Sequence, residues 1–186
     1  LIALRSIPNI KVFRPCDGKE TLAAYISAFT ENAPTVLILS RQNLQQNKNS
    51  GIHALAGGYI LSDCKGKPDV ILIGTGSEID LCTGAKELLE SQKIKTRVVS
   101  MSCMELFEKQ TKEYQEHVLP KSVKARVCVE AASHFAWYKY SRDYGEVIAM
   151  HTFGISGPAK ELFAHFGFTK ENVAEKAKLS LENSKK

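Results

Sequence analysis

Residues 69–80 have the sequence DVILIGTGSEID, which combines an apolar run, a glycine-rich turn and a polar cap. The apolar run from Val70 to Ile73 is continuous, as is typical of a strand covered by helices on both faces. Two glycines follow it, and Ser77 and Asp80 have the spacing of a box that caps the start of a helix. The segment therefore predicts a strand, a tight turn and a helix, which is the repeating unit of an α/β protein.

The same alternation extends in both directions along the chain. Further strands are expected at residues 10–13, 35–40, 58–61, 97–100, 125–130 and 146–150, and further helices are expected to begin near Asp17, Ser102, Pro158 and Thr169. Because strands alternate with helices, the sequence predicts a three-layer α/β/α domain with a largely parallel, possibly mixed sheet. A truncated β-α-β unit precedes this domain.

The chain divides into two units joined by a polar connection. Residues 1–41 contain two strands and one helix, too little to close a core alone. Residues 42–57 are rich in Gln and Asn with little periodicity, which is typical of a linker, and residues 58–186 form a complete α/β domain. Because the sequence opens with Leu1 and not Met, we expect the chain to be a fragment of a longer protein.

The composition is that of an ordinary globular protein and excludes several classes of function. Of 186 residues, 44% are hydrophobic and 24% charged, which argues against disorder. The 25 Lys and Arg residues exceed the 20 Asp and Glu residues but are scattered, so no nucleic acid partner is expected. No apolar run is long enough for a membrane span. Five cysteines without a CxxC pair, and no visible secretory leader, favour a reducing compartment and a cytoplasmic location.

Arg41 is the most interesting candidate for ligand binding. It lies directly after the predicted strand 35–40, at the carboxyl end, where open α/β sheets usually bind their ligands. A planar guanidinium binds phosphate or carboxylate through two parallel hydrogen bonds, and Gln42 and Asn43 beside it can bind hydroxyl groups. From these residues alone, ligand binding and a plain surface position are equally well supported.

Two other candidates favour structural roles. The turn Gly74-Thr75-Gly76-Ser77 precedes a helix start that could attract an anion, but Ile79 replaces a third glycine and no Walker lysine follows, which favours a tight turn. Glu130 and His134 could form an acid-base pair, but no nucleophile accompanies them, so a packing role is favoured.

The five histidines lack metal-ligand spacing, and no metal-binding residue is expected. Aromatic residues at 135–138 and 163–168 are expected in the core.

Several sequence strings together resemble the transketolase family. They are Arg14-Pro15-Cys16-Asp17, Ser40-Arg41-Gln42-Asn43-Leu44, Gly57-Gly58-Tyr59, residues 69–78 and Phe153-Gly154. They occur in the family's order, which implies the end of a pyrimidine-binding domain at 1–41, a linker at 42–57 and the family's C-terminal domain at 58–186. Cys16 and His134 depart from the smaller residues expected there, without weakening the resemblance.

The resemblance implies a function for the longer protein. Transketolases use thiamine diphosphate and a divalent metal, Mg or Ca, to transfer a two-carbon ketol unit from a ketose phosphate to an aldose phosphate in the pentose phosphate pathway, and they act as homodimers. It implies that Arg41 holds the phosphate of the sugar substrate. The family's cofactor and metal motifs have no counterpart in this sequence, so no catalytic, cofactor-binding or metal-binding residue is expected here, and the fragment alone is expected to be inactive.

Two alternatives remain open at this stage. Other thiamine enzymes with the same domain plan, such as dihydroxyacetone synthase or deoxyxylulose phosphate synthase, share the resemblance. The second alternative is a noncatalytic α/β interaction module that binds an anion at the helix start near Ser77. Donor and acceptor preference of the longer protein would separate the enzymes, and phosphate binding at Ser77 would support the module.

Overall fold

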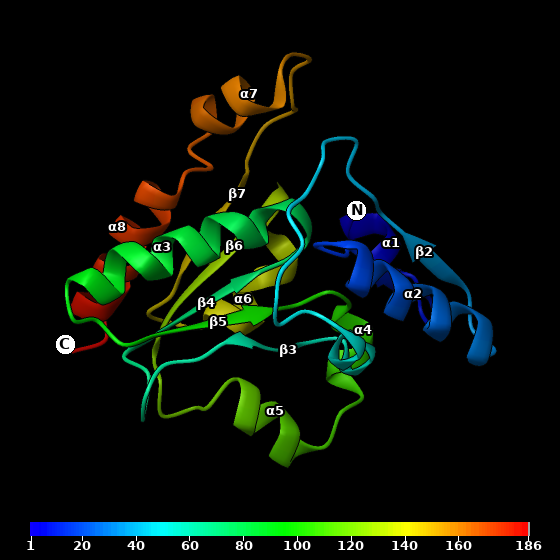
Figure 1. Ribbon diagram of the computed structural model, residues 1–186, viewed down its shortest axis with the longest axis horizontal. Coiled ribbons are helices and arrows are strands. Elements are labelled where there is room, and N and C mark those ends of the chain that lie inside the picture. The colour runs from blue at the N-terminus through cyan, green and yellow to red at the C-terminus, as the bar shows by residue number, and fades with distance from the viewer. Residues whose placement is uncertain (186) are drawn as a thin grey trace.

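The computed structural model describes residues 1–185 and shows a small unit beside a larger domain (Figure 1). The elements of the small unit are α1 (Ile2–Arg5), β1 (Lys11–Phe13), α2 (Gly18–Thr30) and β2 (Thr35–Leu37). Its two strands pair in parallel. The small unit packs β1 against α4 (Met104–Glu108) of the larger domain and α2 against the 3-10 helix η1 (Ile52–Ala56) in the connecting segment.

The larger domain is built on a five-stranded sheet. Its strands are β3 (Tyr59–Ser62), β4 (Val70–Gly74), β5 (Thr96–Ser100), β6 (Ala125–Ser133) and β7 (Glu146–Met150). Their spatial order is β3-β5-β4-β6-β7, and only β3 runs antiparallel to its neighbour among the strands of the described chain. The sheet is therefore mixed but largely parallel, which confirms the predicted fold class.

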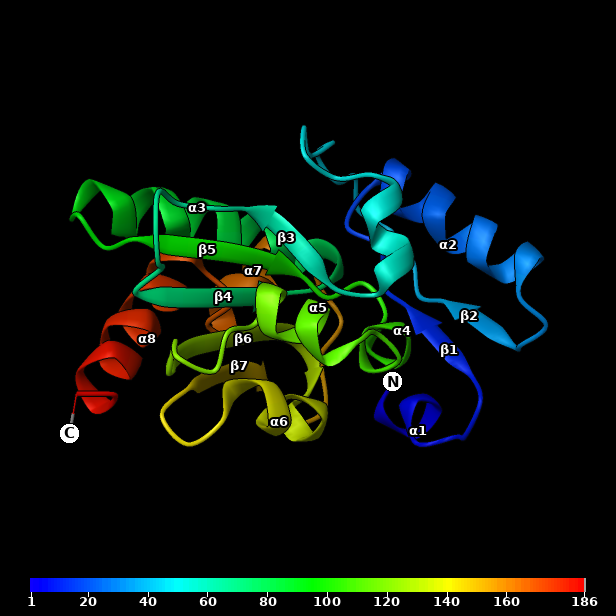
Figure 2. The ribbon, with the colours of Figure 1, turned by 90° about the horizontal axis from the view of Figure 1, so that it is seen from below.

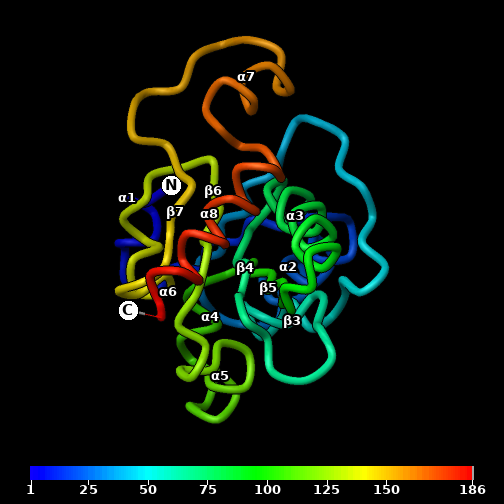
Figure 3. The backbone as a smooth tube through the Cα atoms, turned by 90° about the vertical axis from the view of Figure 1, so that its left-hand side faces the viewer, coloured from blue at the N-terminus to red at the C-terminus, as the bar shows by residue number. Residues whose placement is uncertain are grey.

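Helices cover both faces of this sheet. They are η2 (Gly76–Glu78), α3 (Ile79–Ser91), α5 (Lys112–Val118), η3 (His134–Trp137), α6 (Tyr138–Ser141), α7 (Ala159–His165) and α8 (Lys170–Asn183), together with α4. Figure 1 shows α3 and α8 on one side of the strands and α5 on the other. Figures 2 and 3 show the same layers from two further sides, and α7 extends away from the domain in Figure 3. No helix within residues 1–185 has the length and apolar character needed to cross a membrane.

Side chains of each central strand pack alternately into two hydrophobic clusters, because successive side chains of a strand point to opposite faces of the sheet. Val70 and Leu72 of β4 pack in the cluster with α3 and α8, whereas Ile71 and Ile73 pack in the cluster with α4, α5 and α6. All four side chains are fully buried. The strand that the opening sequence segment predicts is thus covered on both faces, as expected for a central parallel strand.

Two of the predicted helix caps are confirmed and two are wrong. The Asp17 carboxylate accepts hydrogen bonds from the amides of Lys19 and Glu20, and the Thr169 hydroxyl accepts one from Asn172. Ser77 does not cap α3, because a 3-10 turn intervenes and its hydroxyl donates to the Glu78 carboxylate instead. At α4 the N-cap is Cys103, which makes no side-chain cap hydrogen bond, so the cap expected at Ser102 is absent.

Two further expectations need correction. The strand predicted at 35–40 ends at Leu37, and its side chains are half-buried because β1 is its only strand partner among the described residues. Of the aromatic residues predicted in the core, Trp137 and Phe168 are buried, but Phe135 and Tyr138 are 67% and 54% exposed. The short η3–α6 segment turns those two rings outward while it buries Trp137 between them.

Candidate functional site

Arg41 lies in the irregular segment that follows β2, near the carboxyl end of that strand. The hydrogen bonding between β1 and β2 ends at Ile38, whose amide donates to the Phe13 carbonyl at 2.8 Å. Beyond it, the Ser40 hydroxyl donates to the Gln42 carbonyl at 3.2 Å. Arg41 is exposed and makes no hydrogen bond or ion pair within residues 1–185. Its guanidinium therefore has all five N–H donors available for an anion.

The segment that carries Arg41 is held at its far end by the start of α2. The Asp17 carboxylate, which caps this helix, also accepts from the Asn47 amide at 2.9 Å and, at short distance, from the Ser50 hydroxyl. The Lys19 ammonium donates to the carbonyls of Asn47 and Lys48 at 3.1 and 3.2 Å. The loop is thus fixed to the small unit on both sides of Arg41, which limits where the guanidinium can reach.

The turn from Gly74 to Ser77 is filled by Arg14 of the small unit. The Gly76 amide and the Thr75 hydroxyl donate to the Arg14 carbonyl at 3.0 and 3.1 Å. A Cβ atom on Gly76 would lie 3.2 Å from the Arg14 guanidinium. The Arg14 carbonyl already accepts from the Gly76 amide to which an anion would have to bind, which supports the interpretation of this segment as a structural turn.

Glu130 is the centre of a buried group of charges, here named the ion cluster: Arg5, Arg14, Glu78 and Glu130. Arg5 donates to both Glu130 oxygens at 2.7 and 2.9 Å, and Arg14 donates to Glu78 at 2.7 Å and to Glu130 at 3.0 Å. The indole N–H of Trp137 donates to Glu130 at 2.8 Å. Both carboxylates are fully buried at the carboxyl ends of β4 and β6.

The charges in this cluster stabilise one another. Burial alone would raise the pKa of the Glu130 carboxyl, but the hydrogen bond from Arg5 and the charges of Arg5 and Arg14 lower it below its ordinary value. Burial likewise works to lower the pKa of Arg14, and the two carboxylates raise it beyond that effect. The arginines belong to the small unit and the carboxylates to the large domain, so the cluster joins the two.

Glu130 and His134 do not form a catalytic pair. The Glu130 oxygens are taken up by Arg5, Arg14 and Trp137, and no hydrogen bond joins Glu130 to His134. The His134 ring stacks on His151, with ring centroids 4.6 Å apart, and its Nδ1 atom is buried without a hydrogen-bond partner. The His134 ring therefore packs against a neighbouring ring and is not paired with Glu130.

A second contact between the units is one that sequence reasoning missed. Besides the Cys16 amide, which donates to its Oε2 at 2.7 Å, the buried Glu20 carboxyl accepts from the Tyr59 and Ser100 hydroxyls at 2.8 and 2.6 Å. Burial raises the pKa of Glu20 more than these hydrogen bonds lower it. The spacing Asp17–Glu20 predicted only a capping role, and nothing in the local sequence indicates the two distant hydroxyls.

The residues at the carboxyl ends of the strands do not fit a metal ion or a diphosphate cofactor. In the described part of the chain, no three His, Cys, Asp or Glu side chains are grouped so that they could hold a metal. In the Gly74–Ser77 turn, which joins a strand to a helix start as a phosphate loop does, the Gly76 amide already donates to the Arg14 carbonyl. No chemical step can therefore be assigned to such a group on the residues of this chain.

Fold and site together define an α/β domain in which arginines of a neighbouring β-α-β unit contact carboxylates at the carboxyl ends of the strands. The family model described as "Transketolase, pyrimidine binding domain" matches residues 1–47, and "Transketolase-like TK C-terminal domain" matches residues 57–169. The chain belongs to the transketolase family.

Known relatives and solved structures agree with this assignment. The chain is 48% identical to a transketolase of Aquifex aeolicus and 47% identical to transketolase 1 of Escherichia coli, and covers 26% and 27% of them with 95% of its own length. A Pichia stipitis transketolase in complex with sedoheptulose-7-phosphate superposes with a TM-score of 0.92 at 44% identity, over 99% of this chain and 27% of that one. The chain thus spans about a quarter of the length of the relatives it matches.

Proposed function

We propose that this chain is part of a thiamine-diphosphate-dependent transketolase, which transfers a two-carbon ketol unit from a ketose phosphate to an aldose phosphate in the pentose phosphate pathway. In this proposal Arg41 binds the phosphate of the sugar. The observation that carries the proposal is the free, exposed Arg41 guanidinium at the carboxyl end of β2, in a chain of this family. A solved Pichia stipitis relative is a complex with sedoheptulose-7-phosphate, which supports a sugar phosphate as the ligand.

The proposal includes a division of labour within the longer enzyme. Residues 1–41 complete a pyrimidine-binding domain, residues 42–57 are the linker and residues 58–186 the C-terminal domain. Thiamine diphosphate and its divalent metal, Mg or Ca, bind to parts of the enzyme outside this chain and supply the carbanion chemistry. The enzyme works as a cytoplasmic homodimer, and the present chain alone does not turn over substrate.

The experiment is a kinetic comparison in the longer enzyme. Arg41→Ala removes a charge-assisted contact worth about 1.5–3 kcal/mol, so KM for phosphorylated sugars should rise by about tenfold or more. KM for unphosphorylated sugars should stay unchanged, because their complexes never contained that contact. Lys48→Ala, which removes one positive charge from the same exposed segment, is the matched control and should alter neither constant.

Further measurements distinguish the proposed function from the alternative hypotheses. Equal effects of Arg41→Ala on both kinds of sugar would remove the phosphate role of this residue. Dihydroxyacetone synthase and deoxyxylulose phosphate synthase activities are distinguished by assaying the longer enzyme with their own donors and acceptors. The hydrogen bond from the Gly76 amide to the Arg14 carbonyl disfavours the anion-binding module, which a flat phosphate titration of this chain would eliminate.

A further inference from the structure

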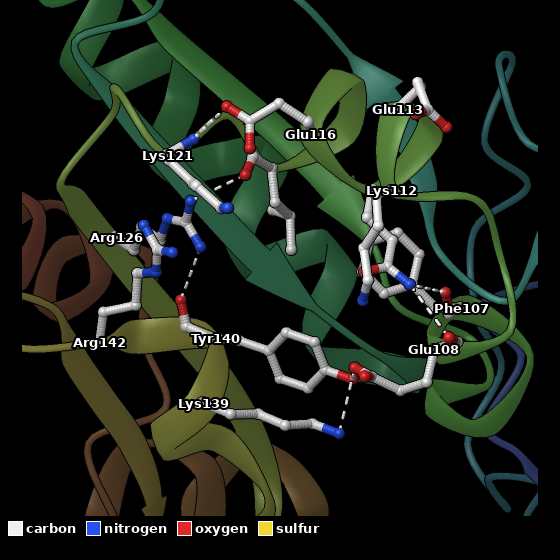
Figure 4. Close-up of a pocket in the computed structure, with 12 residues that line it drawn as sticks. Phe107, Glu108, Lys112, Glu113, Glu116, Lys121, Arg126, Lys139, Tyr140 and Arg142 are labelled. Carbon is white, nitrogen blue, oxygen red and sulfur yellow. Dashed lines mark hydrogen bonds and ion pairs between the residues drawn. The ribbon is translucent and has the colours of Figure 1, made fainter.

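A cavity of about 600 Å³ lies on the face of the sheet that α4, α5 and α6 cover (Figure 4). Five basic side chains line it: Lys112, Lys121, Arg126, Lys139 and Arg142. Three glutamates also line it, so the wall carries an excess of positive charge. The proposed function does not use this cavity. Arg126 lies at the amino end of β6, whereas the ion cluster lies at the carboxyl ends of the strands.

Arg126 is a buried cation without an ion-pair partner. Its side chain is 3% exposed, and it donates only to main-chain carbonyls: Nε to Val123 at 3.2 Å, Nη1 to Tyr140 at 3.0 Å, and Nη2 to Leu119 and Pro120 at 2.9 and 3.0 Å. Burial, and then the charge of Arg142, lower its pKa to about 10, so it remains charged at neutral pH. The Glu116 carboxylate opposes this shift but forms no ion pair with it.

Buried charges in proteins are usually paired with an opposite charge. Here the structure holds a second cation, Arg142, near the first instead. Neither Arg142 nor Lys121 forms an ion pair within the described chain, and both are exposed at the cavity. By contrast, Lys139 is paired with Glu108 at 3.1 Å, and Lys112 donates to the neutral Gln115 side chain at 3.2 Å. Four cations of this wall, Lys112, Lys121, Arg126 and Arg142, and two carboxylates, Glu113 and Glu116, thus have no ion-pair partner in the described chain, and the wall keeps an excess of positive charge.

The backbone at Arg142 is strained. Its φ and ψ of 61° and −158° lie in a region that is almost restricted to glycine. The preceding turn of α6 holds it there, since its amide donates to the Tyr138 carbonyl at 2.9 Å. Its side chain lies on the wall that also carries Arg126 (Figure 4).

We propose that this cavity binds a small molecule carrying a diphosphate or two adjacent phosphate groups. The Arg142 guanidinium and the Lys121 ammonium can donate to several phosphate oxygens at once, and the buried charge of Arg126 adds attraction although main-chain carbonyls take up most of its donors. The cavity is larger than one phosphate requires and falls within the usual range for small-molecule sites.

The test is calorimetric titration of this chain with inorganic pyrophosphate, with inorganic phosphate and ADP as separate arms. We expect saturable binding of pyrophosphate that weakens with added salt and exceeds that of phosphate by about tenfold. Tighter binding of ADP than of pyrophosphate would identify an organic diphosphate as the ligand, and the reverse order would identify free diphosphate.

Four variants locate the binding. Arg142→Gly removes the guanidinium and suits the local backbone, so it should fold normally and bind pyrophosphate about tenfold or more weakly. Lys121→Ala should weaken binding as well. Lys65→Ala, an exposed lysine elsewhere, and Arg41→Ala should leave the affinity unchanged.

Three results would overturn the proposal: no saturable binding, no change with Arg142→Gly, or an equal loss with Lys65→Ala, which would indicate attraction to overall charge. A loss with Arg41→Ala would place the anion at the proposed sugar-phosphate site instead. Because that residue belongs only to the proposed function, failure of one proposal leaves the other standing.

Discussion

At the scale of single residues, Glu130 is the carboxylate that both arginines of the ion cluster contact. Replacing it with Ala removes the acceptor of Arg5 and of the Trp137 indole, and leaves Arg14 with only Glu78. Breaking a buried ion pair by removing one partner typically costs about 3–5 kcal/mol, because the remaining charge stays buried. We expect a loss of this size in the free energy of unfolding of Glu130→Ala, measured by urea denaturation.

The control for this prediction is Glu90→Gln. Glu90 is half-exposed and pairs with Lys86 one helical turn away, at 2.8 Å. Pairs of this kind contribute about 0.5 kcal/mol or less. If Glu130→Ala were no more destabilising than Glu90→Gln, the ion cluster would not be what holds the small unit to the domain.

Glu20 gives stability a dependence on pH with a definite sign. Because burial raises its pKa in the folded chain above the ordinary value of 4.5, the folded state keeps this proton when the unfolded state has lost it. Stability therefore falls as pH rises above about 4.5, by at most about 1.4 kcal/mol per pH unit from this group.

Glu20→Gln removes this titration. Urea denaturation between pH 4.5 and neutral should show the variant gaining stability relative to the parent chain as pH rises. Glu130, whose pKa is lowered, acts in the opposite sense and only below its ordinary value of 4.5, so it does not obscure the effect. A constant difference between Glu20→Gln and the parent across this range would contradict the assignment.

At the scale of elements, the turn between β4 and η2 depends on one glycine. Gly76 has a φ of 57°, and an added Cβ would lie 3.2 Å from the Arg14 guanidinium. A left-handed conformation costs a residue with a side chain about 1–2 kcal/mol. Gly76→Ala should lower the free energy of unfolding by that amount, whereas Gly154→Ala, with nothing within 4 Å, should change it by less than about 0.5 kcal/mol.

The helix α2 shows what periodicity can and cannot predict. Leu22, Tyr25 and Phe29 recur at helical spacing and correctly predict a helix there, but they are exposed, Phe29 by 83%. The side that α2 buries is small and polar, with Ala24 and Glu20 among its residues. A period identifies a helix, but which side is buried depends on the partner, here η1, which is distant in sequence.

At the scale of the whole molecule, the layered fold was predictable because continuous apolar strands such as 70–73 alternate with capped helices. The contacts between the two units were not predictable from the sequence. Arg5 and Glu130 are separated by 125 residues, and nothing in either local sequence indicates the other. Arg41 is a candidate that its place after a strand indicates, whereas nothing in the sequence indicates Arg126, because a buried arginine bound to carbonyls resembles any strand residue in sequence.

The central claim is that Arg41 binds a sugar phosphate, and the most direct measurement is a coupling free energy. In the longer enzyme, kcat/KM is determined for a ketose phosphate and its unphosphorylated analogue, each with Arg41 and with Arg41→Ala. The account predicts a coupling of about 1.5–3 kcal/mol between the guanidinium and the phosphate group. A coupling indistinguishable from zero would contradict it.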